Sequence, residues 1–276
     1  MTGLSTPAGF RIVEEGAGRL MVDGELADEI CACGLARGEA WDDLLRRAAP
    51  GVGRGATARL LLPSGRRLVL KKLRRGGLLG PLWRDRFLGA RRLLDNLSLP
   101  LAARARGVTT PAALAVLAVQ GPPGLFQGWL ALDEIRDARD LATRLDSSSP
   151  PTAVELTKVM NQVRVMHEAG VEHRDLNLGN LLIRESTAGD TQVFVTDLDG
   201  ARLHEAGLPF SLRQRALRRL ERSWAKLFHG TRSDGADTGW IYRGYAGADA
   251  EMARRLERGR RMGRFSIHLH RLSWRR

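Results

Sequence analysis

Residues 173–180 read HRDLNLGN, and residues 197–200 read DLDG. The two stretches carry acidic and amide side chains, namely Asp175, Asn180 and Asp197. Phosphoryl transfer needs a carboxylate that accepts the proton of an attacking hydroxyl, and hard oxygen ligands that hold Mg²⁺ against a triphosphate. We therefore expect Asp175 to be a catalytic base, and Asn180 and Asp197 to be Mg²⁺ ligands.

The first stretch fits the pattern H-R-D-L-x-x-x-N in every fixed position, and the second is a D-x-D-G variant of D-F-G. These are the catalytic-loop and metal-binding motifs of protein kinases. Asp, Asn and Gly also occur in solvated turns, and an isolated D-x-x-x-x-N would favour that interpretation. A complete motif followed by a second acidic one favours catalysis. His167 and His173 have no neighbours at zinc-ligand spacing, so we expect them to pack or form hydrogen bonds.

Helix and hairpin signals surround the first stretch. Thr152 and Glu155 have the spacing of a capping box, and apolar residues then recur at helical intervals until Gly170. Residues 181–183 and 193–195 are apolar runs separated by a polar segment, which predicts a hairpin. Such a hairpin would return the second motif to the edge where the first one lies.

A glycine-rich segment, GVGRGAT, occupies residues 51–57. Glycine lacks a Cβ and adopts positive φ, so the backbone N–H groups of such a loop can approach a phosphate. We expect Gly51, Gly53 and Gly55 to contact nucleotide phosphates. The segment departs from G-x-G-x-x-G at Ala56, and a glycine-rich turn without a ligand would have the same composition.

A second hairpin is predicted from residues 58–62 and 66–71, joined by a Pro/Gly turn. Its second strand ends in LVLKK, which resembles V-A-I-K in character. We expect Lys71 to hold the α- and β-phosphates, with Lys72 on the opposite strand face as the alternative. The acids available to pair with this lysine are Asp85 and Asp95.

Strand patterns dominate the first half of the chain, and helical patterns dominate the second. We therefore predict an α+β, two-lobed, protein-kinase-like fold. Residues 1–132 would form a strand-rich N-lobe that binds the nucleotide phosphates. Residues 133–276 would form a mainly helical C-lobe with the catalytic loop, the metal site and basic C-terminal helices.

The chain of 276 residues has a formal charge of +13 and a sequence pI near 11.1, which predicts an anionic partner. Arginines fill one face of a helix predicted at residues 212–228, and more follow between residues 254 and 264. We expect them to attach the protein peripherally to an anionic membrane surface, the alternative being a plain solvated face. Nucleic-acid binding is disfavoured because only 5% of the residues are aromatic.

The longest wholly apolar run, residues 112–119, is much shorter than the roughly 20 residues that a membrane-spanning helix needs. The first residues lack the pattern of a secretory signal. Cys31 and Cys33 are the two cysteines, and their spacing does not support a disulfide framework. These features predict a reducing, cytoplasmic environment.

The sequence also resembles the bacterial lipopolysaccharide core kinases, most of all those that act on 3-deoxy-D-manno-octulosonic acid (Kdo). The segments that carry the resemblance are residues 53–55, 68–77, 84–87, 166–182 and 196–202. The resemblance implies a protein-kinase fold that uses ATP to phosphorylate a Kdo sugar of the lipid A-linked inner core, at the cytoplasmic face of the inner membrane. The alternatives are a kinase for another sugar or a protein hydroxyl, and a catalytically degenerate binding module.

Overall fold

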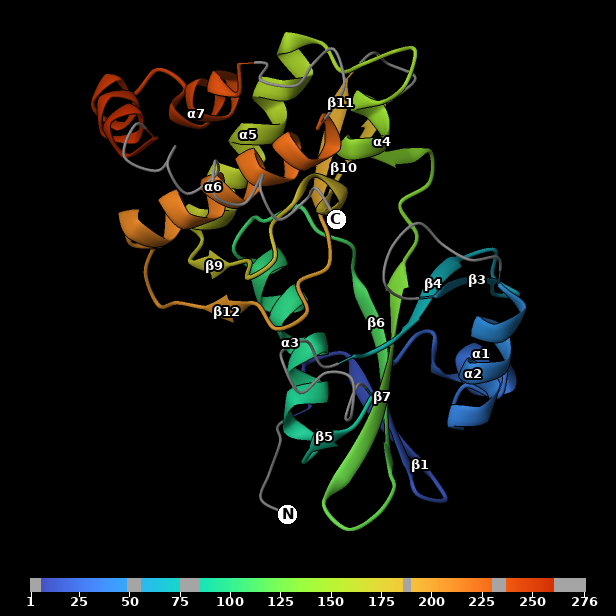
Figure 1. The fold of residues 1–276 in the computed structure, drawn as a ribbon. Coiled ribbons are helices and arrows are strands. Elements are labelled where there is room, and N and C mark those ends of the chain that lie inside the picture. The colour runs from blue at the N-terminus through green and yellow to red at the C-terminus, as the bar shows by residue number, and fades with distance from the viewer. Residues whose placement is uncertain (1–5, 49–55, 75–84, 186–189, 230–236, 261–276) are drawn as a thin grey trace. The chain divides into compact units, whose positions relative to one another are not determined.

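The computed structural model describes the whole chain except residues 1–5, 49–55, 75–84, 186–189, 230–236 and 261–276 (Figure 1). The chain forms two compact units. The first holds Met1–Ala102 and Pro111–Glu134, and the second holds Ala103–Thr110 and Ile135–Arg276. The short segment 103–110 therefore belongs to the second unit, although it precedes two strands of the first.

A seven-stranded antiparallel sheet is the centre of the first unit. Its strands follow the order β1-β2-β6-β7-β4-β3, and β5 pairs with β7. The hairpin predicted around the Pro/Gly turn is present as β3 and β4, within one residue of the expected bounds. The strands are β1 (Phe10–Glu15), β2 (Gly18–Asp23), β3 (Thr57–Leu61), β4 (Arg67–Lys72), β5 (Phe87–Leu88), β6 (Ala113–Gln120) and β7 (Leu125–Asp133).

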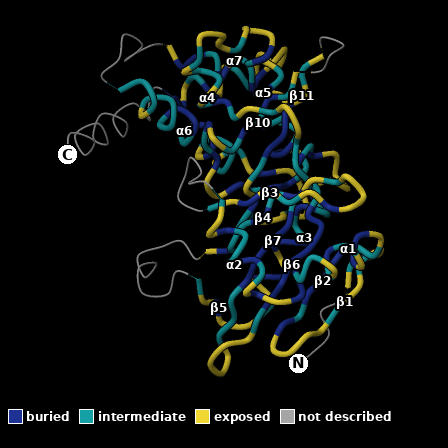
Figure 2. The backbone as a smooth tube through the Cα atoms, turned by 90° about the vertical axis from the view of Figure 1, so that its right-hand side faces the viewer, coloured by how far each residue is buried: buried dark blue, intermediate teal, exposed yellow. Residues whose placement is uncertain are grey.

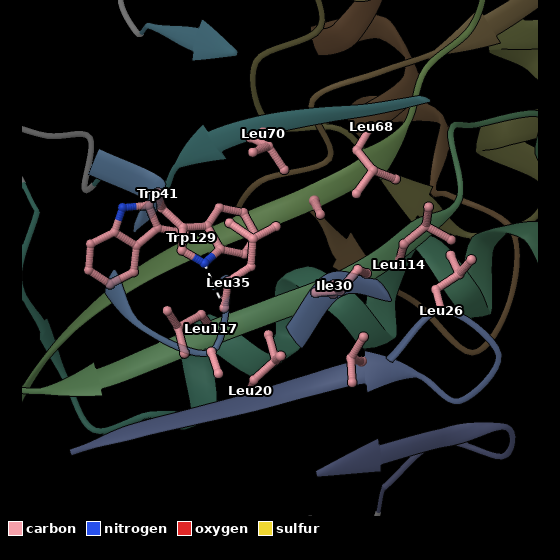
Figure 3. Close-up of a cluster of buried hydrophobic side chains, with 14 of the residues drawn as sticks. Leu20, Leu26, Ile30, Leu35, Trp41, Leu68, Leu70, Leu114, Leu117 and Trp129 are labelled. Atoms are coloured by element: carbon pink, nitrogen blue, oxygen red, sulfur yellow. Dashed lines mark hydrogen bonds between the residues drawn. The ribbon is translucent and has the colours of Figure 1, made fainter. Parts of the chain in front are cut away.

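Two short helices, α1 (Ala27–Ala32) and α2 (Gly38–Arg47), cover one face of this sheet. Two buried tryptophans organise the interface, Trp41 from α2 and Trp129 from β7 (Figure 3). The Trp41 Nε1 atom donates a hydrogen bond to the Leu35 carbonyl at 2.8 Å, so its polar group is satisfied. Gly38 is required beside them, because a Cβ there would lie 2.8 Å from the Trp129 ring.

The helix α3 (Arg91–Ala105) packs against the other face. Leu93, Leu94 and Leu97 of this helix join a buried cluster that includes Val116 and Leu130 of the sheet. Buried residues follow β6 almost continuously and fill the middle of β7, as Figure 2 shows, because helices cover the sheet on both sides. This explains the unbroken apolar run in β6.

The second unit is mainly helical. The helix α5 (Ala153–Glu168) begins with the predicted capping box. The Thr152 hydroxyl accepts from the Glu155 N–H at 3.2 Å, and the Glu155 carboxylate accepts from the Thr152 N–H at 2.7 Å. The predicted hairpin is also present, as β10 and β11. The elements are β8 (Ala138–Asp140), α4 (Leu141–Leu145), α5 (Ala153–Glu168), β9 (Val171–Glu172), the 3₁₀ turn η1 (Leu178–Asn180), β10 (Leu181–Glu185), β11 (Thr191–Val195), β12 (Arg202–Leu203), α6 (Phe210–Leu227) and α7 (Gly239–Ala246).

A buried carboxylate joins the C-terminal helices. Glu221 of α6 accepts hydrogen bonds from the Thr238 hydroxyl at 2.5 Å and the Tyr242 hydroxyl at 2.8 Å. Arg260 lies in a helical segment over residues 250–260 and donates to the same carboxylate at 3.2 Å. The buried charge is therefore paired and hydrogen-bonded. No helix among the described residues has the length and apolar character to cross a bilayer.

A buried histidine sits at the end of α5. His167 is fully buried, and its Nδ1 atom lies 2.9 Å from the Tyr245 hydroxyl, which also lies 3.5 Å from Arg213 Nη1. Burial lowers the pKa of His167 from 6.5 to about 3, and the electrostatic effects of Arg213 and of the His173 ring act in the same direction. The folded protein therefore holds this imidazole neutral.

The free energy of unfolding should decrease as the pH is lowered, because His167 takes up a proton at a higher pH in the unfolded chain than in the folded protein. The stabilisation is fully present above the unfolded pKa of about 6.5 and is lost as the pH falls toward 3. Between pH 7 and pH 5 the loss is about 2 kcal/mol. We expect urea unfolding of His167→Gln to show a pH dependence that is smaller by this amount, whatever its absolute stability. Equal pH dependence in both proteins would contradict the assignment.

Candidate active site

The site begins where α5 ends. Gly170 follows the helix with φ +78°, and a Cβ at this position would lie 2.6 Å from the carbonyl oxygens of His204 and Ala206. Only glycine meets both conditions without strain. The chain then enters β9, which pairs with β12, and His173 follows directly. The glycine expected to end the helix therefore also directs the chain into the catalytic turn, residues 173–180.

His173 connects the two sequence motifs. Its buried ring places Nε2 2.9 Å from the Thr196 carbonyl, and its Nδ1 accepts from the Asp175 N–H at 3.3 Å. A carbonyl can only accept, so Nε2 carries the proton and the ring is neutral. Burial lowers the pKa of His173, while the hydrogen bond to Thr196 and the Asp197, Asp175 and Asp199 carboxylates act to raise it. The three carboxylates therefore surround one neutral imidazole.

Two asparagines hold the turn that carries Asp175. The side-chain amide nitrogens of Asn177 and Asn180 donate to the Asp175 carbonyl, at 3.0 and 2.9 Å. The Asn180 carbonyl accepts from the Thr196 N–H at 2.9 Å. Because the Asn180 amide nitrogen is used in this way, its Oδ1 is the side-chain atom that can face a cation.

Asp197 is held in an unusual backbone conformation, with φ +59°. Non-glycine residues adopt the left-handed region at a cost of about 1–2 kcal/mol, although aspartate tolerates it better than most. The next residue, Leu198, is buried and anchors the segment, while the Asp175 and Asp197 side chains are exposed. The turn therefore presents both carboxylates to solvent instead of burying them.

The oxygen atoms gathered here suit Mg²⁺. They are the Asn180 amide oxygen and the Asp197 and Asp199 carboxylates, and Mg²⁺ prefers a few carboxylates together with water and substrate phosphates. In the described part of the chain, no group of three or more His, Cys, Asp or Glu residues is placed to hold a metal ion by itself.

Two supporting contacts carried no signal in the sequence. Arg106 donates to the carbonyls of Ala169 and His204, at 2.9 and 2.6 Å, and so braces the strands before and after the turn. Ser223 of α6 accepts from the Leu178 N–H at 3.3 Å, at the start of η1. One arginine among many and one serine in a helix have no distinguishing pattern, so these contacts become visible only in three dimensions.

The two lysines of β4 point to opposite faces of the sheet. Lys72 Nζ lies 3.2 Å from Asp42 of α2, 3.6 Å from Asp85 and 4.9 Å from the centre of the Trp129 ring. Strand alternation then puts Lys71 on the face that α3 covers. Asp85 therefore pairs with Lys72, and Asp95 is exposed on α3.

The structure brings Asp175, Asn180 and Asp197 together in the second unit, and it places Lys71 in the first. Gly51, Gly53 and Gly55 lie outside the described residues.

Comparison with known proteins agrees with this geometry. The model of the lipopolysaccharide kinase (Kdo/WaaP) family matches residues 45–245. A 3-deoxy-D-manno-octulosonic acid kinase of Vibrio parahaemolyticus is 32% identical over 193 residues, which cover 68% of this chain and 76% of that protein. The enzyme of the same name from Xanthomonas oryzae is 29% identical over 199 residues, or 71% of this chain and 75% of that protein.

Among solved structures, WaaP in complex with acyl carrier protein is similar, with a TM-score of 0.51 and 22% identity over 90% of this chain and 97% of that one. At this identity the likeness shows the fold, and it confirms the prediction of a protein-kinase-like α+β fold. The predicted resemblance to the lipopolysaccharide core kinases is confirmed by the family match, which covers more than half of the chain. The chain therefore belongs to the lipopolysaccharide kinase (Kdo/WaaP) family.

Proposed function

We propose that this chain transfers the γ-phosphoryl group of ATP to a hydroxyl of a Kdo sugar on the lipid A-linked inner core. The observation that carries the proposal is the turn centred on His173, which presents Asp175, Asn180 and Asp197 in a chain of the Kdo/WaaP family. The names of the Vibrio and Xanthomonas relatives support Kdo as the acceptor.

Asp175 is the proposed base. Its carboxylate is exposed, while its backbone N–H and carbonyl are held by His173 and the two asparagines. As the acceptor oxygen attacks the γ-phosphorus and the bond to the ADP oxygen breaks, the hydroxyl proton passes to this carboxylate. A fixed backbone with a solvent-facing carboxylate suits a group that must meet a substrate.

Asn180 and Asp197 are the proposed Mg²⁺ ligands. Mg²⁺ bound there would neutralise the negative charge that the triphosphate develops during transfer. Hydrogen bonds within the protein position these two ligands. The His173 ring is bonded to the Thr196 carbonyl, directly before Asp197, and the Thr196 N–H donates to the Asn180 carbonyl.

In the first unit, we assign the α- and β-phosphates to Lys71 and to the backbone of Gly51, Gly53 and Gly55. The support for Lys71 is its strand face, because Lys72 is already occupied by Asp42, Asp85 and the Trp129 ring. A lysine used to hold α2 against the sheet cannot also contact a nucleotide on the opposite face.

We also propose that the protein binds peripherally to the cytoplasmic face of the inner membrane. Arg254, Arg255 and Arg258 are exposed on the helical segment 250–260, and a Kdo acceptor linked to lipid A lies in a membrane. Each basic residue near an anionic leaflet contributes about 1 kcal/mol, so a few suffice for reversible attachment.

Kdo-lipid A incubated with the protein, Mg²⁺ and γ-labelled ATP should become labelled. Asp175→Asn should lower kcat by about 10²- to 10⁴-fold, because it removes the proton acceptor. Asp190→Asn, at an exposed position paired with Lys158, is the matched control and should retain wild-type turnover. Label on protein substrates alone would contradict the Kdo assignment, and Mg²⁺-ATP binding without turnover on any lipid acceptor would indicate a binding module.

The two lysines should separate activity from stability. Lys71→Met should lower kcat/KM for ATP by about 10- to 100-fold, the equivalent of a lost charged hydrogen bond. Lys72→Met removes the cation next to Asp42 and Asp85, which keep their hydrogen bonds from Trp129 and Gln127, and should cost about 1 kcal/mol of stability, with KM for ATP unchanged. The reverse pattern would assign the phosphates to Lys72.

Co-sedimentation with vesicles checks the membrane proposal. Binding to anionic vesicles should fall as salt rises, because exposed charges are screened within about 8 Å at 0.15 M. Removing two charges with Arg254→Gln and Arg258→Gln should weaken it by roughly 2 kcal/mol, whereas neutral vesicles should bind neither protein. Protein that stays in the supernatant at low salt but retards nucleic acid in a gel would refute the proposal.

A further inference from the structure

One face of α6 is positively charged along its length. Its residues are spaced three or four apart, so helical geometry places them side by side, opposite the buried Leu217 and Leu220. None has a carboxylate partner among the described residues. We name this face the α6 strip, and it consists of Arg215, Arg219, Arg222 and Lys226.

The pKa of a strip residue is shifted in the opposite direction to that of an arginine with a carboxylate partner. The hydrogen bond to Asp133 raises the pKa of Arg66, as expected for a cation with a partner. The pKa of Arg222 is instead lowered, first by burial and then by the positive charges of Arg219 and Arg218. The repulsion from these two arginines outweighs the attraction of the Glu221 carboxylate, which is already paired with Arg260.

A solvated surface does not account for this arrangement. Like charges three or four residues apart destabilise a helix by about 0.2–0.5 kcal/mol per pair. Arg219 and Arg222 are also partly buried, so water does not fully compensate their charge. The strip retains an unfavourable repulsion that a bound anion would relieve.

The position of the strip relates it to the catalytic turn. On one side, Ser223 accepts the Leu178 N–H at 3.3 Å and joins α6 to η1, the end of the turn that carries Asp175. On the other side, Arg218 donates to the Gly259 carbonyl at 2.9 Å. The strip therefore runs between the catalytic turn and the helical segment 250–260.

We propose that the α6 strip binds the carboxylate and phosphate groups of the acceptor and so orients its hydroxyl toward Asp175. The inference rests on the proposed function, because it takes the acceptor to be a sugar acid linked to a phosphorylated lipid. Guanidinium groups bind carboxylates and phosphates through two parallel hydrogen bonds, which fixes orientation as well as affinity. An acceptor with several anionic groups can contact neighbouring cations of the strip while its hydroxyl reaches the base.

Kinetics with a soluble acceptor test the proposal. The probe is the deacylated oligosaccharide of Kdo-lipid A, which keeps its carboxylates and phosphates but forms no membrane. Arg219→Gln and Arg222→Gln should each raise KM for this acceptor about tenfold, with KM for ATP unchanged. Arg243→Gln, at an exposed arginine paired with Asp237, is the matched control and should leave both KM values unchanged.

Loss of folding is separable from loss of binding. Both strip variants remove like-charge repulsion, so their melting temperatures should equal or exceed that of the wild type. Unchanged KM for the acceptor in both variants would overturn the proposal. Unchanged KM together with weaker sedimentation on anionic vesicles would also overturn it, and would assign the strip to the membrane surface.

Failure of the proposed function gives a different result. If the wild type does not phosphorylate the oligosaccharide, calorimetric titration of the same compound onto the protein decides the inference. Binding by the wild type that is lost in the double variant would support an anion-binding strip without Kdo kinase activity. Equal binding by both proteins, or binding by neither, would overturn it.

Discussion

The geometry of the catalytic turn depends on the neutral imidazole of His173. Its Nε2 donates to the Thr196 carbonyl while its Nδ1 accepts from the Asp175 N–H, and only a neutral ring protonated at Nε2 does both. Protonation would set two N–H donors against each other. Burial lowers the pKa of this ring, although nearby carboxylates oppose the shift. Burial thus maintains the charge state on which the spacing of the proposed base and the proposed metal ligands depends.

The backbone is strained at Asp197, whereas Gly170 adopts its positive φ without strain. Asp197 adopts a positive φ, and Gly170 adopts one where a side chain would collide with two carbonyls. The Val195 N–H bonded to the Thr109 carbonyl and the buried Leu198 bracket Asp197. Strain of about 1–3 kcal/mol persists only where neighbours over-determine the conformation. The segment 103–110, which begins in the last turn of α3, therefore supports the site through the Thr109 carbonyl.

Local signals explain which parts of the structure the sequence predicts. The capping box at Thr152, the β10–β11 hairpin and the β3–β4 hairpin each depend on residues close in the chain, and the structure contains all three. The helices α1 and α2 were not predicted, because their positions depend on distant partners such as Trp129. The β1–β2 hairpin was not predicted either, although its two-residue turn at Gly16 and Ala17 is local. Similarly, alternation identified the faces of Lys71 and Lys72, but only the contacts of Lys72 showed which face α2 covers.

The helix α6 shows why a correct pattern can leave its meaning open. Its apolar stripe and arginine face are evident from periodicity, which predicts one buried and one solvated side. In the structure, Ser223 and Arg218 bond elements on both flanks of the arginine face, so part of it is enclosed. Periodicity reports where a helix meets its core, but it carries no information about elements packed beside the polar face. The distinction between a solvated surface and an anion-binding one therefore depends on tertiary contacts and on whether these cations have carboxylate partners, of which the described residues supply none.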